Sequence, residues 1–242
     1  MRIAVIADIH SNLNALEAVL GAVGHVDAIW HLGDTVGYGP QPQAVVDRLR
    51  SVGATGVRGN HDDAGGGGTS LEFFNPDGYR AMEWTRTQID ESTRLYLAML
   101  PERRVFEGSG FTLAHGSPSD PIWEYVDSPE VAQANLAAFE TPYCLVGHTH
   151  VPVVFRESRG RVKAMLAHQG ARLALDGRRM ILNPGSVGQP RDGDPRSSYM
   201  LIDTDAAQAT WHRVEYDIGA TQAAMAAAGL PPRLARRLSF GR

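Results

Sequence analysis

Short apolar segments that end directly in residues able to bind a metal ion constrain the fold of this chain more than any other feature. Ile3–Ala7 is a continuous apolar run rich in β-branched residues, as in strands covered on both faces, and Asp8 and His10 follow it. Apolar spacing then predicts two helices with a strand between them, over 13–23, 43–52 and 28–32. This alternation predicts a parallel α/β sheet, whose functional site lies at the carboxyl ends of its strands.

The pattern changes after His150, where strands with hairpin-like connections are expected. These strands are predicted over 151–156, 161–167, 172–175, 180–183, 199–203 and 209–214. They suggest a second, largely antiparallel sheet packed on the first. Strands are also expected over 111–114 and 143–146, and one or two helices over 83–100, stopped by Pro101.

Three segments allow two interpretations each. Residues 65–68 are four glycines, which form either a flexible solvent loop or a mobile rim over the site. Residues 118–143 form either a lid or a connection. In the C-terminal helical tail, 220–242, a stripe of leucines at 230, 234 and 238 predicts a docked helix or an oligomer contact.

Length and charge limit the function. A chain of 242 residues suits one domain, 1–242, and a net charge of −4 gives no general attraction for long nucleic acid or anionic membranes. The only cysteine, Cys144, excludes a disulfide framework and is expected to be a small buried hydrophobe. No signal peptide or membrane span is visible, so a cytoplasmic location is expected.

Five clusters carry metal-ligand chemistry in a single order. They are Asp8-Ile9-His10, Gly33-Asp34, Gly59-Asn60-His61-Asp62, His115-Gly116 and Gly147-His148-Thr149-His150. Two ions about 3.5–4 Å apart repel each other and need a bridging carboxylate, for which Asp34 is the natural candidate. Imidazole mixed with carboxylate or amide oxygen suits two divalent ions of Mn, Fe, Co, Ni or Zn better than Ca or Mg.

These motifs resemble the calcineurin-like metallophosphoesterase superfamily, whose series is D-x-H, G-D, G-N-H-[DE], H and G-H-x-H. The segment from Asn183 to Gly188 is typical of its small prokaryotic phosphodiesterase branch. The resemblance implies a four-layer α/β/β/α sandwich of two mixed sheets flanked by helices. It implies a first metal held by Asp8, His10, Asp34 and His150. It implies a second metal held by Asp34, Asn60, His115 and His148, with His61 as the catalytic acid for the leaving group.

One departure concerns the substrate. Protein-phosphatase relatives resemble G-D-Y-V-D-R-G, whereas this chain has Gly37 and Tyr38 in place of the second Asp and the Arg. The change argues against phosphoprotein substrates and predicts an open turn with room for a second ester group. It leaves Asp62 or a backbone carbonyl to orient His61. Tyr38 and Arg191 are candidate substrate-binding residues, the alternatives being loop packing and a solvated hairpin charge.

The motifs together predict a dinuclear metal-dependent phosphoesterase that uses a metal-bridging hydroxide. Small phosphodiesters, such as cyclic nucleotides or nucleotide esters, are the expected substrates. The alternatives are a phosphomonoesterase, or a non-catalytic metal-binding scaffold for protein partners. Homo-oligomer formation stays open.

Overall fold

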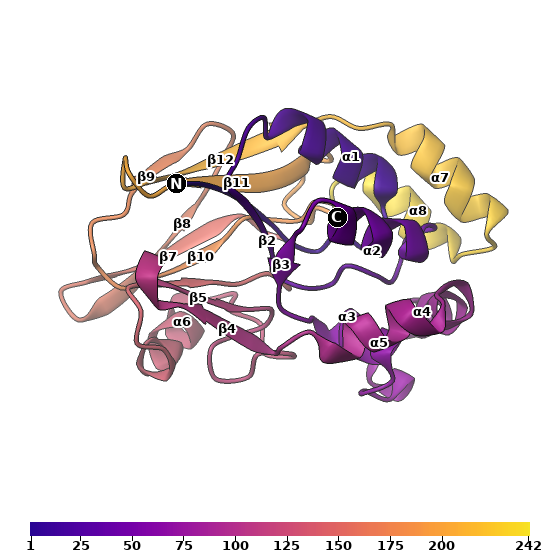
Figure 1. Cartoon of the computed structure of the whole chain (residues 1–242), viewed down its shortest axis with the longest axis horizontal. Helices are drawn as coiled ribbons and strands as arrows, with labels where there is room; N and C mark the ends of the chain where they lie inside the picture. Colours follow the sequence, from indigo (N-terminus) through magenta and orange to yellow (C-terminus); the bar gives the residue numbers. More distant parts are fainter.

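The computed structural model describes residues 1–242, whose strands form two six-stranded sheets (Figure 1). The first sheet, in the order β3-β2-β1-β11-β12-β9, has the bounds Thr55–Gly56, Ala28–His31, Arg2–Ile6, Ser197–Asp203, Gln208–Val214 and Arg172–Ala174. The second sheet, in the order β4-β5-β6-β10-β7-β8, has the bounds Arg103–Phe106, Phe111–Ala114, Tyr143–Leu145, Met180–Asn183, Val153–Ser158 and Arg161–Leu166. Both sheets mix parallel and antiparallel pairs.

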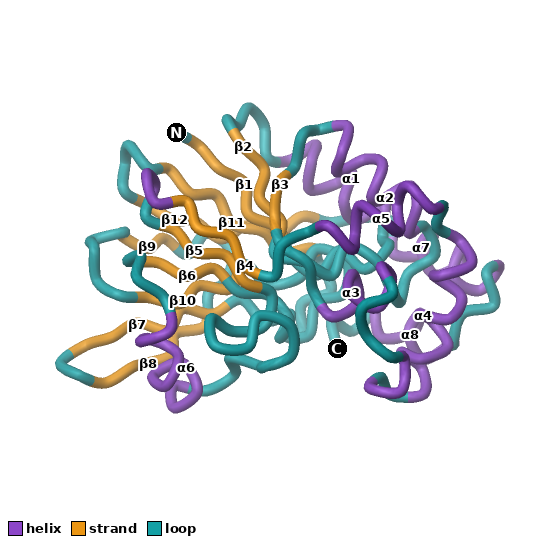
Figure 2. Tube along the Cα trace, turned by 60° about the horizontal axis from the view of Figure 1, so that its bottom comes forward, coloured by secondary structure: helices purple, strands orange, loops and turns teal.

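Most helices gather at one side of the two sheets, and only α6 lies beside the second sheet (Figure 2). Helices α1 to α8 have the bounds Leu13–Ala22, Pro42–Ser51, Asn60–Gly66, Pro76–Gln88, Glu91–Met99, Pro129–Asn135, Ile218–Ala227 and Pro232–Leu238. Three short 3₁₀ turns span Leu71–Phe73, Glu107–Ser109 and Leu136–Ala138. None of the helices combines the length and apolar character that crossing a bilayer requires.

Alternating side chains on the strands define the layers. On β1, Ile3 and Val5 pack between the two sheets, while Ala4 and Ile6 pack against α1 and α2. On the second sheet, Cys144 is fully buried in the cluster that contains α6, where burial raises the pKa of its thiol to about 12. The predicted α/β/β/α order and the buried, inert cysteine are therefore confirmed.

The expected division of strands between the sheets is wrong. Strands β9, β11 and β12 join the N-terminal sheet, and β5 and β6 join the second sheet. The parallel strands β3, β2 and β1 leave one edge of β1 open, and β11 pairs there in antiparallel register, with Ile3 opposite Ile202. Hydrophobic periodicity marks which residues form strands, but it carries no information about which strands pair.

The interpretation of 65–68 as a solvent loop or mobile rim is wrong for its first half. Gly65 and Gly66 are buried in the last turn of α3, and the left-handed Gly67 ends the helix at φ 94°. A β-carbon on Gly66 would lie 2.9 Å from the backbone nitrogen of Ala98 in α5. Gly66 therefore allows α3 and α5 to pack backbone against backbone at this point.

Gly66→Ala is expected to lower the free energy of unfolding by about 1–3 kcal/mol, because the close helix pair must separate. Gly21→Ala is the matched control, since Gly21 lies on the exposed face of α1 with nothing within 4 Å of an added β-carbon. It should raise the stability by about 0.5–1 kcal/mol through helix propensity. Urea denaturation measures both; a Gly66→Ala protein as stable as the Gly21→Ala protein would contradict the packing argument.

Two other helix predictions are settled. Residues 83–100 form parts of two helices, α4 and α5, which separate at Ile89. The leucine stripe of the C-terminal tail is buried against Tyr38, Ala81 and Met225. Helix α8 is therefore docked on its own chain, so that this stripe is not an exposed oligomer contact.

Candidate metal centre

The five clusters converge on one buried site at the carboxyl ends of β1, β2, β3, β5 and β6. Three groups of side chains each bring their ligand atoms within 4.8 Å of one another: Asp8, His10 and His150; His10, Asp34 and His61; and Asp34, His115 and His148. The amide oxygen of Asn60 lies 3.2 Å from His115 Nε2. The structure thus brings together all seven residues predicted to bind metal.

Asp34 lies between the two halves of this site. Its Oδ2 atom is 3.7 Å from His10 Nε2 and 3.4 Å from His115 Nε2. Its Oδ1 atom accepts a hydrogen bond of 2.9 Å from the backbone N–H of His61. One carboxylate oxygen therefore faces both halves, which is the geometry that a bridging ligand needs.

In four of the histidines, one ring nitrogen is hydrogen-bonded to a backbone carbonyl oxygen. The nitrogens of His10, His150, His115 and His148 contact the carbonyl oxygens of Val36, Gln189, Leu32 and Trp123 at 3.2, 2.6, 2.8 and 3.1 Å, respectively. A carbonyl only accepts hydrogen bonds, so this nitrogen carries the proton. The other nitrogen of each ring faces into the site and offers a lone pair whenever the ring is neutral.

These inward nitrogens face one another in two pairs. His10 Nε2 is 3.1 Å from His150 Nε2, and His115 Nε2 is 3.0 Å from His148 Nδ1. Two lone pairs at this distance repel unless a proton or a cation lies between them. In addition, the Oδ2 atom of Asp8 is buried with no hydrogen-bond partner. The donor set therefore fits two cations, one at each imidazole pair.

The pKa values of the site show a shortage of positive charge. Burial raises the pKa of Asp8 to about 7. Burial also opposes ionisation of Asp34, but the positive charge of His115 holds the pKa of Asp34 well below the usual range. Burial lowers the pKa of His115, yet the negative charge of Asp34 outweighs it and raises that pKa to about 9. Protonated His115 thus offsets the charge of Asp34, and Asp8 takes up a proton as the pH falls through about 7, whereas bound cations would neutralise both carboxylates.

Backbone strain is concentrated in the same loops. Asp8, His10, Asp34, His148 and His150 all have φ between 48° and 65°, a region that non-glycine residues rarely occupy. Such conformations persist only where the surrounding structure enforces them, and they cluster at functional sites.

The segment from Asn183 to Gly188 provides much of this enforcement. Ser186 donates a hydrogen bond of 2.8 Å to the carbonyl of Asp8, and Asn183 donates one of 2.7 Å to the carbonyl of Gly147. A β-carbon on Gly188 would lie 1.8 Å from the carbonyl oxygen of Ile9. The segment therefore fastens the loop of the first cluster to the loop of the fifth.

His61 has neither of the two expected orienting partners. Its Nδ1 atom lies 3.2 Å from the sulfur of Met82. The carboxylate of Asp62 instead accepts hydrogen bonds from the backbone N–H groups of Thr35 and Gly59, at 2.8 and 3.1 Å, so it supports the loop that carries Asp34.

The turn at Gly37 is not open, contrary to expectation. A β-carbon on Gly37 would lie 2.2 Å from His61 Nδ1, and one on Gly39 would lie 2.2 Å from the carbonyl oxygen of His10. Glycine is needed here because the turn packs directly against the site. The room for a substrate lies elsewhere.

That room is a pocket of about 90 Å³ above the ligand residues, with a mainly aromatic rim. Tyr38 lines it, with its ring against His10 and His61 at centroid distances of 4.6 and 4.3 Å. Arg191 lines it as well, half-buried, with its Nε atom unpartnered. Both candidate substrate-binding residues therefore reach the pocket.

The remaining rim residues were not predicted individually. They are Phe73, Phe74, Asn75, Trp123 and Tyr125. The ring of Tyr125 stacks on His148 at a centroid distance of 3.8 Å. Trp123 and Tyr125 belong to the segment 118–143, whose aromatic content was the only sequence signal for them; closure of this segment as a lid stays a prediction.

Two packed mixed sheets with buried His and Asp clusters at their strand ends define a metal-dependent phosphoesterase fold. The chain belongs to the calcineurin-like phosphoesterase superfamily, whose domain model matches residues 1–207.

Several relatives are similar over most of their length. The uncharacterised protein MJ0912 of Methanocaldococcus jannaschii is 37% identical over 246 residues, which cover 99% of this chain and 98% of that protein. The phosphodiesterase YfcE of Escherichia coli is 28% identical, covering 85% of this chain and 89% of that protein. The crystal structure of a metallophosphoesterase from Sphaerobacter thermophilus matches with a TM-score of 0.92 and 48% identity, covering 100% and 99% of the two chains.

Proposed function

We propose that this protein is a dinuclear metal-dependent phosphoesterase that hydrolyses small phosphodiesters. One observation carries the proposal. Two pairs of imidazole nitrogens, one in His10 and His150 and the other in His115 and His148, face each other on either side of Asp34. Asp8, His10, Asp34 and His150 would hold one ion, and Asp34, Asn60, His115 and His148 the other. When bound, two divalent transition-metal ions supply an activated water and polarise the phosphoryl oxygens.

The chain's own residues would bind the ester and handle the leaving-group proton. Arg191, which lines the pocket, would pair with a phosphate oxygen, and the aromatic rim would limit the access of water. Burial lowers the pKa of His61 to about 4, so the free imidazole is neutral at pH 7. A phosphate anion beside it would raise that pKa and favour the protonated form. His61 would then donate this proton to the departing oxygen.

Three observations favour diesters over monoesters. The turn at Gly37 and Tyr38 provides no arginine, so Arg191 is the only arginine that lines the small pocket. A monoester dianion would need a second charge-matched partner more than a diester monoanion does. The rim of Phe74, Trp123 and Tyr125 offers apolar surface to a second ester group. The relative YfcE is named a phosphodiesterase.

A matched pair of nitrophenyl esters tests the substrate class. The bis-nitrophenyl diester should have a higher kcat/KM than nitrophenyl phosphate, by about tenfold, the effect of one charge-assisted hydrogen bond. Both are assayed with Mn²⁺ at neutral pH and after metal removal with a chelator. A preference for the monoester would leave the phosphoesterase class standing and replace the substrate by a phosphomonoester. Equal rates with and without metal would contradict the class itself.

A further inference from the structure

A second, larger pocket opens beside the metal centre. It has a volume of about 770 Å³ and is lined by residues of the α4 start, the loop after β10 and helix α8. Four of its lining residues, Tyr38, Asn75, Tyr125 and Arg191, also line the small pocket above the ligand residues. The two pockets are therefore continuous, and one molecule can occupy both.

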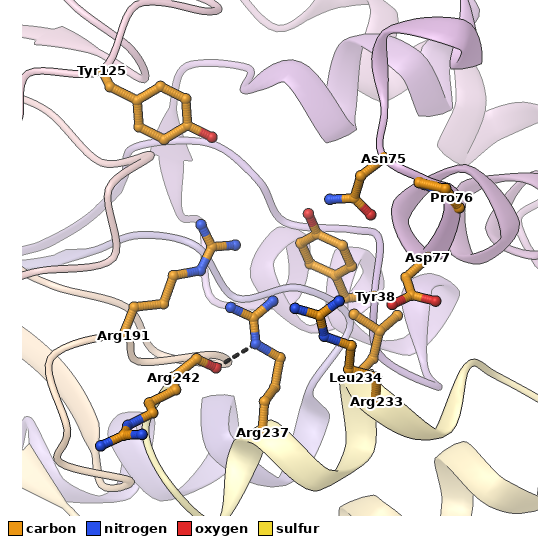
Figure 3. Close-up of a pocket in the computed structure, with 10 residues that line it drawn as sticks. All are labelled: Tyr38, Asn75, Pro76, Asp77, Tyr125, Arg191, Arg233, Leu234, Arg237 and Arg242. Atoms are coloured by element: carbon orange, nitrogen blue, oxygen red, sulfur yellow. Dashed lines mark hydrogen bonds between the residues drawn. The ribbon is translucent and has the colours of Figure 1, made fainter.

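Three arginines turn their guanidinium groups into this larger pocket (Figure 3). Arg191 comes from the loop after β10, and Arg233 and Arg237 come from one face of α8. The side chain of Arg242 also lines the pocket, but its guanidinium group points away from the other three (Figure 3). The pocket thus presents a basic wall built from two distant parts of the chain.

None of these arginines forms an ion pair with a side-chain carboxylate, although Arg237 Nε donates a hydrogen bond to the main-chain oxygen of Arg242 (Figure 3) and Arg191 donates one of 3.0 Å to Gln189 Oε1. The arginines that pair with carboxylates in this structure are Arg48, Arg58, Arg94, Arg156, Arg178, Arg196 and Arg213. Asp77 lines the pocket, but it is the only carboxylate to do so. Burial and the charge of Arg191, with a further contribution from Arg233, lower the pKa of Arg237 to about 10. The three positive charges therefore repel one another, and Asp77 is the only side-chain carboxylate in the pocket that offsets them.

We propose that this arginine wall binds a second phosphate group of the substrate while the scissile diester lies over the metal centre. The proposal rests on the phosphoesterase function and narrows its substrate class to nucleotide-like diesters that carry an additional phosphate. Guanidinium groups bind phosphate oxygens through paired hydrogen bonds, so Arg233 and Arg237 match a dianion, while Arg191, which lines both pockets, stays available to the scissile group. The leucine stripe of α8, buried against Tyr38, holds the arginines at this wall.

Two thymidine esters provide the test. Thymidine 5′-(nitrophenyl phosphate) and its 3′-phosphorylated derivative share the scissile bond and the leaving group, and differ only in a second phosphate. The native protein with Mn²⁺ should show a kcat/KM at least about tenfold higher for the phosphorylated ester, mostly through KM. In Arg233→Gln/Arg237→Gln this preference should fall to about one.

Arg236→Gln is the matched control, because Arg236 is on the same helix, is exposed and does not line the pocket. It should keep the full preference. Should the double variant fail to fold, Arg233→Gln alone, at an exposed position, should still lower the preference. A native protein with no preference, or a preference that survives in the folded variants, overturns the proposal.

Two further measurements distinguish a substrate phosphate site from a site for free phosphate, and failure of the wall from failure of the diesterase function. Inorganic phosphate added to the unphosphorylated ester should not accelerate its turnover; acceleration would mean that the wall binds a free ion, which overturns the proposal. If neither ester is hydrolysed, the diesterase function fails, and calorimetry with thymidine 3′,5′-bisphosphate tests the wall alone. Binding at least about tenfold weaker in the double variant supports a phosphate site, and equal binding overturns it.

Discussion

Asp34→Asn is expected to lose both metal ions and to lower kcat/KM for the nitrophenyl diester by about 10³-fold or more. The reason is that Oδ2 of Asp34 faces both imidazole pairs, so the change removes the only negative charge that both ions would share. The amide preserves the shape of the side chain and can still accept the hydrogen bond from His61, which keeps the fold intact.

Metal content by mass spectrometry and turnover of the same samples measure this effect. Asp63→Asn is the control, because Asp63 lies on α3 close to the site, pairs with Arg58 and does not line the pocket. It should keep about two ions per chain, as the native protein should. His10→Ala should weaken mainly one ion. Two ions retained in Asp34→Asn would show that Asp34 does not bridge.

His61→Ala is expected to keep the metal ions and to lower kcat for poor leaving groups by about 10²–10⁴-fold. The loss should be much smaller for nitrophenyl esters, because nitrophenolate departs without a proton. The argument depends on the position of the ring, which lies at the edge of the pocket with Nδ1 directed toward Met82.

The structure also places His61 in a cluster with His10 and Asp34, so its assignment as an acid must be separated from a ligand role. Metal content decides between them: loss of an ion in His61→Ala would make it a ligand. An equal decrease for alkyl and nitrophenyl esters would refute proton donation. His212→Ala, a substitution outside the site on β12, should change neither quantity.

The parts of the site that the sequence predicts are those encoded locally. Asp8 and His10 follow a strand at short range, and the same is true of Asp34 and His115, so an apolar run and its end predict their position. Their convergence follows from the geometry of parallel strands. The layered architecture was predictable from the same apolar runs and from the resemblance of the motifs to the calcineurin-like superfamily.

The parts that were not predicted depend on contacts between distant segments. The pairing of β1 with β11 is decided by which apolar edge remains open after β1, β2 and β3 have assembled. The contact between Met82 and His61 depends on how α4 packs. In the sequence, the arginines of α8 are recognisable only as charged residues beside an apolar stripe. Their position next to the metal centre depends on the docking of that helix.

The interleaving of the two sheets has a consequence for the order of events during protein synthesis. Asp8 and His10 leave the ribosome long before Ser186 and Gly188, which hold their loop in its strained conformation. Strand β11, which covers the open edge of β1, follows later still. A nascent chain therefore carries an exposed edge of β1 until β11 has been made, and the loop of Asp8 and His10 is not held in place before Ser186 and Gly188 have emerged.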